Sequence, residues 1–221
     1  MGTFSTTSFL GALLAFIFGT GFAKGMQAFV AYRLGDRLPR SEGRMSFSPT
    51  RHMEPLGLLL ALLLGLGVPV ITWGKPLNLN PFANRLKRIG GSLIALTGFL
   101  SYVFLGVIAG LIFRSVGEII PTFFAELLIW FTYFNFLLAA FNVIPIPPLD
   151  GYGFLKGFLS PNWDAKLLWL ETYGPVLILV LALILPYFLG GLNGNFNILY
   201  QFIFGPIVRF FLGLLGLTTG V

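Results

Sequence analysis

The sequence predicts an all-α polytopic membrane protein with five or six transmembrane helices. Hydrophobic residues occupy 56% of its 221 positions and charged residues only 10%, whereas a soluble domain carries about a quarter charged residues. Several apolar runs approach the length of about 20 residues that a helix needs to cross the bilayer core. Short polar segments separate these runs, which favours a single transmembrane domain over residues 1–221.

The apolar runs define the expected helices in order. The first two are separated by a polar stretch, 33–54, in which Arg44–Ser48 alternates as a short strand does, so we expect a strand and a re-entrant loop there. We also expect a short interfacial helix over 162–172 and a turn over 190–195. The last run either spans the membrane or lies in its interface. The six runs cover residues 8–32, 56–73, 89–113, 121–143, 175–189 and 198–217.

A proline-rich segment follows the fourth run and reads N-x-x-P-x-P-P-L-D-G over residues 142–151. Closely spaced prolines cannot continue a helix, because each removes a backbone donor and clashes with the preceding turn. At membrane depth, such irregular backbone must be shielded by protein or must line a cavity. This segment is therefore expected to shape an internal site. Its candidate site residues are Asn142, Pro145, Pro147, Pro148, Asp150 and Gly151.

The net charge of +6 does not indicate nucleic-acid binding. The basic residues lie in short loops between apolar runs, as charges that flank membrane helices do. The chain has no cysteine and one histidine, so a disulfide framework and a thiolate metal site are both excluded. The expected surroundings are membrane lipids and other integral membrane proteins.

The proline-rich segment resembles the signature of the site-2 proteases, a family of intramembrane zinc metalloproteases, and in particular their small prokaryotic branch. The resemblance implies the site-2 protease fold and a prokaryotic cell membrane, and it makes Asp150 the counterpart of the family's third zinc ligand. Further stretches resemble the family in the same order along the chain. They are A-Y-R-L-G-D at 31–36, the segment 43–57, W-G-K-P at 73–76, N-P-F at 80–82 and L-E-T-Y-G at 170–174.

The family's catalytic H-E-x-x-H falls on Ala23–Gln27, where none of its functional residues is present. Two histidines at i and i+4 put both imidazoles on the metal side of a helix, and the glutamate between them is the general base. Ala23 and Gln27 occupy the ligand positions here, and Lys24 occupies the position of the base. With one histidine in the whole chain, no two-histidine site exists in any register. We therefore expect no metal, no cofactor and no enzymatic activity.

The third run departs from the family in a second way. The resemblance places a Gly-Pro-x-x-Asn-like pattern, which helps to position substrate, at residues 98–102. Phe99 and Tyr102 stand at the proline and asparagine positions. Two bulky aromatic side chains are expected to fill the space through which a peptide would enter.

Lys24 and Asp150 are ionisable residues at positions that correspond to the family's metal site. A charge inside a bilayer costs at least ~2.5–3.5 kcal/mol, so each of them is expected to have a compensating partner. If the fold is retained, Lys24 and Asp150 both face the former zinc pocket. The ammonium of Lys24 would then replace the metal as the counter-charge of Asp150, and Gln27 would donate a hydrogen bond. Alternatively, Lys24 extends to the membrane interface. His52 is expected to be a loop residue and not a ligand.

Three classes of function remain. The first is a structural or accessory subunit of a larger membrane complex. The second is a regulatory pseudoprotease that binds transmembrane segments without cleaving them, and the third is an enzyme or transporter with a new site. Filling of the cleft by Phe99 and Tyr102 favours the first class over the second. The lack of nucleophile–base pairs and of spare intramembrane acids disfavours the third.

Overall fold

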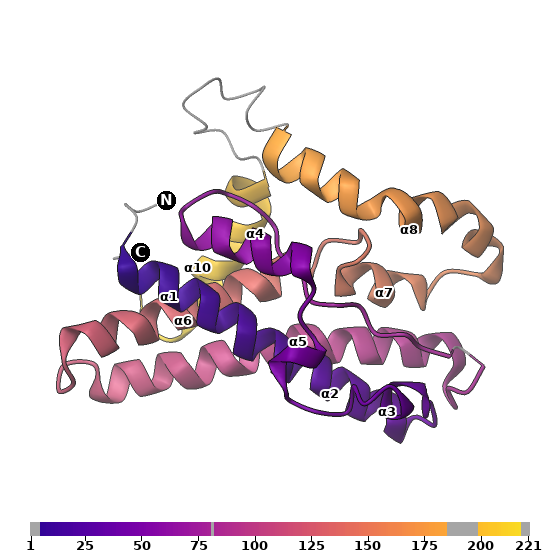
Figure 1. Cartoon of the computed structure of the whole chain (residues 1–221), viewed down its shortest axis with the longest axis horizontal. Helices are drawn as coiled ribbons and strands as arrows, with labels where there is room; N and C mark the ends of the chain where they lie inside the picture. Colours follow the sequence, from indigo (N-terminus) through magenta and orange to yellow (C-terminus); the bar gives the residue numbers. More distant parts are fainter. Residues whose placement is uncertain (1–4, 81, 185–198, 218–221) are drawn as a thin grey trace.

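The computed structural model describes residues 5–80, 82–184 and 199–217, and within these ranges the regular secondary structure is helical throughout. Figure 1 shows the long helix α5 running along the molecule, with α6 beside its second half. The helices are α1 Thr6–Leu14, α2 Thr20–Arg33, α3 Leu38–Ser41, α4 Pro55–Gly65, α5 Lys87–Val116, α6 Thr122–Phe141, α7 Asp150–Lys156, α8 Asp164–Leu179 and α10 Gly205–Leu214. Short 3-10 turns at Pro49–Arg51 and Pro161–Trp163 complete the connections.

Three helical segments are long and apolar enough to cross a membrane. They are Thr6–Arg33, in which a π-helical turn at Ala15–Gly19 joins α1 to α2, and the helices α5 and α6. Shorter apolar helices occupy Pro55–Gly65 and Tyr200–Leu214. The prediction of an all-helical membrane protein thus agrees with the described residues, whereas the larger number of five or six spans stays a prediction.

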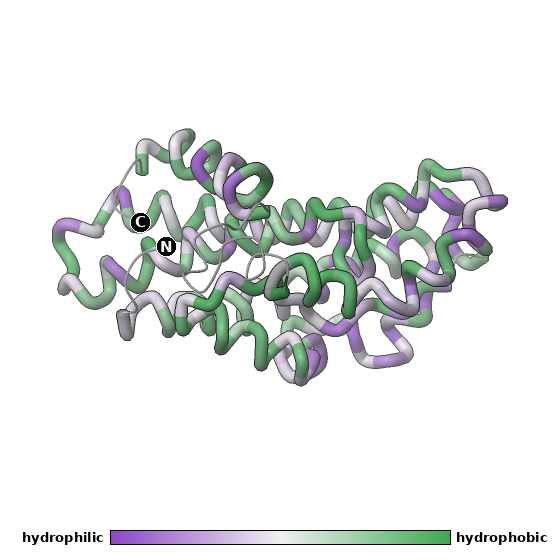
Figure 2. Tube along the Cα trace, turned by 90° about the horizontal axis from the view of Figure 1, so that it is seen from above, coloured by the Kyte–Doolittle hydropathy of each residue, from purple (hydrophilic) through white to green (hydrophobic). Residues whose placement is uncertain are grey.

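The core lies where the second half of α6 meets its neighbours. Residues 132–142 are all buried, so this part of the helix is enclosed on every side. α1, α5 and α10 pack against α6, while α2 and α7 pack against α5 and α4 packs against α1. Figure 2 shows hydrophobic residues along the long helices and hydrophilic residues toward both ends of the molecule, more densely at the end that carries α3 and the beginnings of α5 and α8. This polar end holds the candidate site.

The second apolar run forms a helix over only part of its length. α4 ends at Gly65 after 11 residues, about 16 Å of helix, or half the thickness of a bilayer core. Gly67 then adopts φ 87°, a conformation that L side chains rarely take, and Pro69 provides no amide to continue the helix. Residues 70–73 remain buried in irregular backbone.

The expected strand over Arg44–Ser48 is wrong, because these residues form an irregular loop. A strand needs a partner for its row of backbone groups. Here the Arg44 guanidinium instead binds the carbonyls of Arg51 and Lys75, each at 2.7 Å. The loop lies directly on α2 at Gly25, where a β-carbon would stand 2.7 Å from the carbonyl oxygen of Ser46.

The expected interfacial helix and the expected fifth run join into one helix. α8 continues as a π-helical turn over Val180–Ile184 and contains Pro175 in its interior. The proline removes one backbone hydrogen bond and does not end the helix. Interior prolines of this kind are tolerated in membrane helices. The remainder of that run and the predicted turn over 190–195 lie outside the described residues.

Candidate functional site

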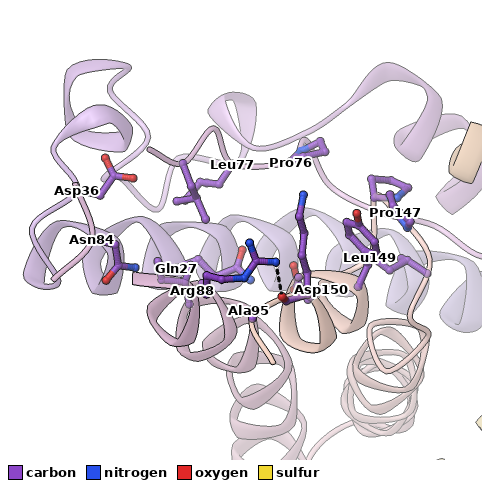
Figure 3. A pocket seen from close by; sticks show the side chains of 18 of the residues that line it. Gln27, Asp36, Pro76, Leu77, Asn84, Arg88, Ala95, Pro147, Leu149 and Asp150 are labelled. Atoms are coloured by element: carbon purple, nitrogen blue, oxygen red, sulfur yellow. Dashed lines mark hydrogen bonds between the residues drawn. The ribbon is translucent and has the colours of Figure 1, made fainter. Parts of the chain in front are cut away.

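A cavity of about 540 Å³ lies at the polar end of the molecule. Its walls come from α2, the segment 76–80, the first half of α5, the proline-rich loop and α7. Figure 3 shows Pro76 and Leu77 on one side of the cavity and Gln27, Ala95 and Asp150 on the other. The cavity therefore gathers five of the stretches that resemble the protease family in sequence, which contribute Asp36, Pro76, Asn80, Pro147–Asp150 and Glu171.

A buried ion pair forms one wall of this cavity. The Lys24 ammonium on α2 donates a hydrogen bond to Asp150 Oδ1 at 2.8 Å, and the two side chains are 6% and 9% exposed. The proline-rich loop places the carboxylate there, because it ends α6 at Phe141 and begins α7 at Asp150. Asn142 supports this turn: its carboxamide donates to the Leu138 carbonyl and accepts from the Asp150 amide.

The structure places Gln27 beside this pair without a hydrogen bond to it. A β-carbon at Gly98 would stand 2.2 Å from Asp150 Oδ2 and 2.3 Å from Gln27 Nε2, so α5 approaches both groups closely. Among the described residues, Asp150 Oδ2 is buried without a hydrogen-bond partner. Ala23 is fully buried in the same helix. The hydrogen bond expected from Gln27 to Asp150 is therefore not made.

The aromatic residues Phe99 and Tyr102 lie outside the walls of the cavity. Tyr102 is 1% exposed, and its hydroxyl donates to Thr20 Oγ1 at 3.2 Å, deep between α5 and α2. Phe99 is half-buried against the hydrophobic core. Tyr102 thus fills space between these two helices, and neither aromatic side chain closes the cavity.

The remaining residues of the proline-rich loop face in two directions. Pro147 and Pro148 line the main cavity, whereas Pro145 lines a smaller apolar cavity of about 150 Å³. Gly151 permits a tight turn, because a β-carbon there would stand 2.4 Å from the Val143 carbonyl oxygen.

His52 lies in the loop after α3, away from the cavity walls. Its ring is fully buried and hydrogen-bonds the Ser46 carbonyl. Burial is the main cause that lowers the pKa of this imidazole below its ordinary value; the bond to Ser46 acts in the opposite direction.

Polar contacts that the sequence did not predict hold the outer wall of the cavity. Asp36 accepts from the Asn80 amide at 2.7 Å, and Arg44 fixes the segment near Lys75. Arg88 on α5 forms a two-bond pair with Asp164 on α8. These partners are far apart in sequence, so no local pattern could have revealed them.

The residues of the cavity do not fit a zinc ion. A zinc site requires at least three nitrogen, sulfur or oxygen ligands from the protein. Within the described ranges, no three histidine, cysteine, aspartate or glutamate side chains come together. The Lys24 ammonium, which would repel a divalent cation, already binds the one carboxylate available at the family position.

We expect the purified protein to lack stoichiometric zinc for this reason. Elemental analysis by mass spectrometry, after purification without chelators or a polyhistidine tag, measures the metal content directly. Roughly one zinc per chain would contradict the geometry and would require another set of ligands.

The chain is similar to curated bacterial proteins that carry two names. It is 32% identical over 161 residues to "Putative zinc metalloprotease YwhC" of Bacillus subtilis, and the match covers 70% of this chain and 71% of that protein. It is 28% identical over 164 residues to "Putative zinc metalloprotease Rip2" of Mycolicibacterium smegmatis, covering 72% and 61%. The Mycobacterium tuberculosis protein of the same name is 29% identical over 167 residues, covering 71% and 60%.

The match thus spans less than two thirds of the Rip2 proteins. No family model matches the chain, and no solved structure matches it.

These relatives contradict the expectation that the chain is not an enzyme. Their names all describe zinc metalloproteases, which points to protease activity rather than to a protein without activity. The expectation rested on the missing ligands and base at Ala23–Gln27 and on the single histidine of the chain. These absences bear on zinc chemistry, and they do not decide what the whole protein catalyses.

Proposed function

The chain belongs to the site-2 protease family, and on this premise we propose that it is a membrane subunit that holds a polypeptide segment of a partner membrane protein in the cavity beside Lys24 and Asp150. One observation carries the proposal: an open cavity of about 540 Å³ adjoins the buried ion pair at the position of the family's metal. We place the protein as a multi-pass protein of the prokaryotic cell membrane, with shorter helices adding to the three long segments to give five or six spans.

The chemistry of the cavity suits a peptide group. The Gln27 side chain lines it, is 2% exposed and makes no hydrogen bond within the described residues. A carboxamide both donates and accepts, so it complements a backbone amide. Its polar atoms are not among the described buried atoms that lack a partner, so they open onto the cavity, where a bound segment would replace water as their hydrogen-bond partner. The apolar walls at Leu77, Ile94 and Ala95 complete the mixture of surfaces typical of binding sites.

The size of the cavity also suits a polypeptide segment. Ligand pockets commonly enclose roughly 300–1,000 Å³, and this cavity lies within that range. A short extended stretch of a partner chain fits a space of this size. A membrane lipid would not need the unpaired carboxamide of Gln27.

Photo-crosslinking in native membranes tests the proposal. A photoreactive residue at Leu77, on the cavity wall, should give a defined adduct with a membrane protein. The same residue at Leu100, which is 52% exposed on the outer side of α5, serves as the control. Gln27→Leu should reduce the Leu77 adduct several-fold, because leucine keeps the volume and removes both hydrogen-bonding atoms.

An adduct from Leu100 alone would place the partner on the outer helices and would contradict binding in the cavity. If the adduct from Leu77 is unchanged in Gln27→Leu, Gln27 does not bind a peptide group of the partner. A shortened partner in the Leu77 adduct would assign a cleavage step to this cavity.

A further inference from the structure

We infer that His52 is a proton-operated latch in the loop that supports the outer wall of the cavity from behind. In its neutral form it holds the loop 44–54 against α2 and the segment 75–80, and protonation in mildly acidic solution releases both. The inference rests on the proposed function only for the identity of the bound segment that an open cavity would release. The movement of the loop itself is a property of this chain alone.

The hydrogen bonds of the ring show why protonation is unfavourable. His52 Nε2 lies at the Ser46 carbonyl oxygen, and because a carbonyl only accepts, Nε2 carries the proton of the neutral ring. His52 Nδ1 is buried and has no partner among the described residues. A second proton would therefore create a buried N–H without an acceptor.

The charges around the ring act in the same direction. The groups that face it are Arg44 and Arg51 from its own loop and Lys24 from α2, and all three are cations. Glu54 follows closely in the chain, but its carboxylate accepts the Trp73 indole N–H at 2.7 Å. A protonated His52 would thus add a fourth positive charge near the other three, and this one would be fully buried. Burial and these cations lower the pKa of the imidazole below its ordinary value of 6.5.

The loop is joined to the cavity wall through the backbone of His52 itself. Its carbonyl accepts the Lys75 amide at 2.7 Å, and Arg44 binds the Lys75 carbonyl at 2.7 Å. The next two residues, Pro76 and Leu77, line the cavity. Release of the loop would therefore free Lys75, and Pro76 and Leu77 of the cavity wall follow it directly in the chain.

The sign of the effect follows from proton linkage. In the released loop His52 has its ordinary pKa, and in the closed loop its pKa is lower, so the released state binds more protons as the pH falls. The opening equilibrium should rise up to about tenfold between pH 7.5 and pH 5.5, since most of the change lies below the free-histidine pKa.

Hydrogen exchange on the full chain in micelles measures this equilibrium, after correction for the intrinsic pH dependence of exchange. Peptides over 44–54 and 74–80 should lose protection by up to about tenfold between the two pH values, while a peptide over 100–112 of α5 serves as the reference. In His52→Gln the carboxamide keeps a donor toward Ser46 and cannot titrate, so the change should disappear. Unchanged protection in the wild type, or an equal change in His52→Gln, would overturn the latch.

A second measurement does not depend on any variant. His52 is the one histidine of the sequence, so labelling histidine gives a single imidazole signal in an untagged protein. Its titration midpoint should lie below 6.5, and a midpoint at or above 6.5 would overturn the inference. Both measurements report on the loop and not on a bound segment. The crosslinking experiment can therefore fail while the latch stands, and the reverse also holds.

Discussion

Lys24→Met should destabilise the protein by about 3–5 kcal/mol, because it leaves the carboxylate of Asp150 buried without a counter-charge. Within the described part of the chain, the ammonium of Lys24 provides the one hydrogen bond to Asp150 Oδ1, and the other carboxylate oxygen is buried without a partner. Methionine has a similar length and no charge, so the lost interaction is mainly electrostatic. The midpoint of thermal unfolding in detergent, read with the wild type in the same micelles, measures the effect.

The double variant Lys24→Met/Asp150→Leu separates the pair from any other role of Lys24. Removing both charges removes the need for either, and buried ion pairs replaced by apolar residues are often neutral or more stable by about 1–4 kcal/mol. We therefore expect the double variant to regain most of the stability that Lys24→Met loses. A double variant as unstable as the single one would show that the two residues do not act as a pair.

The exposed pair of Lys156 and Glu171 provides a matched control. Its side chains are 34% and 36% exposed, and exposed ion pairs contribute about 0–1 kcal/mol. Lys156→Met should therefore shift the unfolding midpoint little. Equal effects of Lys24→Met and Lys156→Met would contradict the burial of the Lys24 pair.

Local patterns in the sequence predict the long helices well and the irregular segments poorly. α5 and α6 are continuous apolar runs without an internal proline, so hydropathy alone indicates them. The run 56–73 has the same composition, but its last residues are buried without being helical. Thr72 makes a 2.6 Å hydrogen bond to the Gly57 carbonyl there. Apolar composition therefore predicts that a segment is buried. Whether it is helical also depends on residues that interrupt helices, here Gly67 and Pro69.

The candidate site depends on contacts that no local pattern records. Arg44 binds a carbonyl 31 residues away, and Asp36 binds an amide 44 residues away. Lys24 and Asp150 are 126 residues apart, and only the family's motifs suggested that they face one site. The expected filling by Phe99 and Tyr102 assumed a single space, whereas neither side chain is among the residues that line the open cavity.

Gly98→Ala should be destabilising by about 1–3 kcal/mol, as overpacked buried positions commonly are. The new methyl group would stand 2.2 Å from Asp150 Oδ2 and 2.3 Å from Gln27 Nε2. Free side chains would move away at little cost. Asp150 is instead 8% exposed and bound to Lys24, so its displacement would strain or break the ion pair. The midpoint of thermal unfolding in detergent measures this loss of stability.

Gly91→Ala is the matched control, because it lies on the same helix and a β-carbon there meets none of the described atoms within 4 Å. Alanine in a helix interior is favoured over glycine by about 0.5–1 kcal/mol, so Gly91→Ala should be neutral or slightly stabilising. If Gly98→Ala behaved like Gly91→Ala, the close approach of α5 to the ion pair would be refuted.

Adding Gln27→Ala to Gly98→Ala then assigns the strain to one of the two groups. The amide would leave the crowded space, while the carboxylate would still stand 2.2 Å from the new methyl group. Partial recovery of the unfolding midpoint is expected, because Lys24 still holds Asp150 in place. Full recovery would mean that the carboxylate moves freely, and an ion pair that yields so easily could not be the fixed structural replacement for a metal ion.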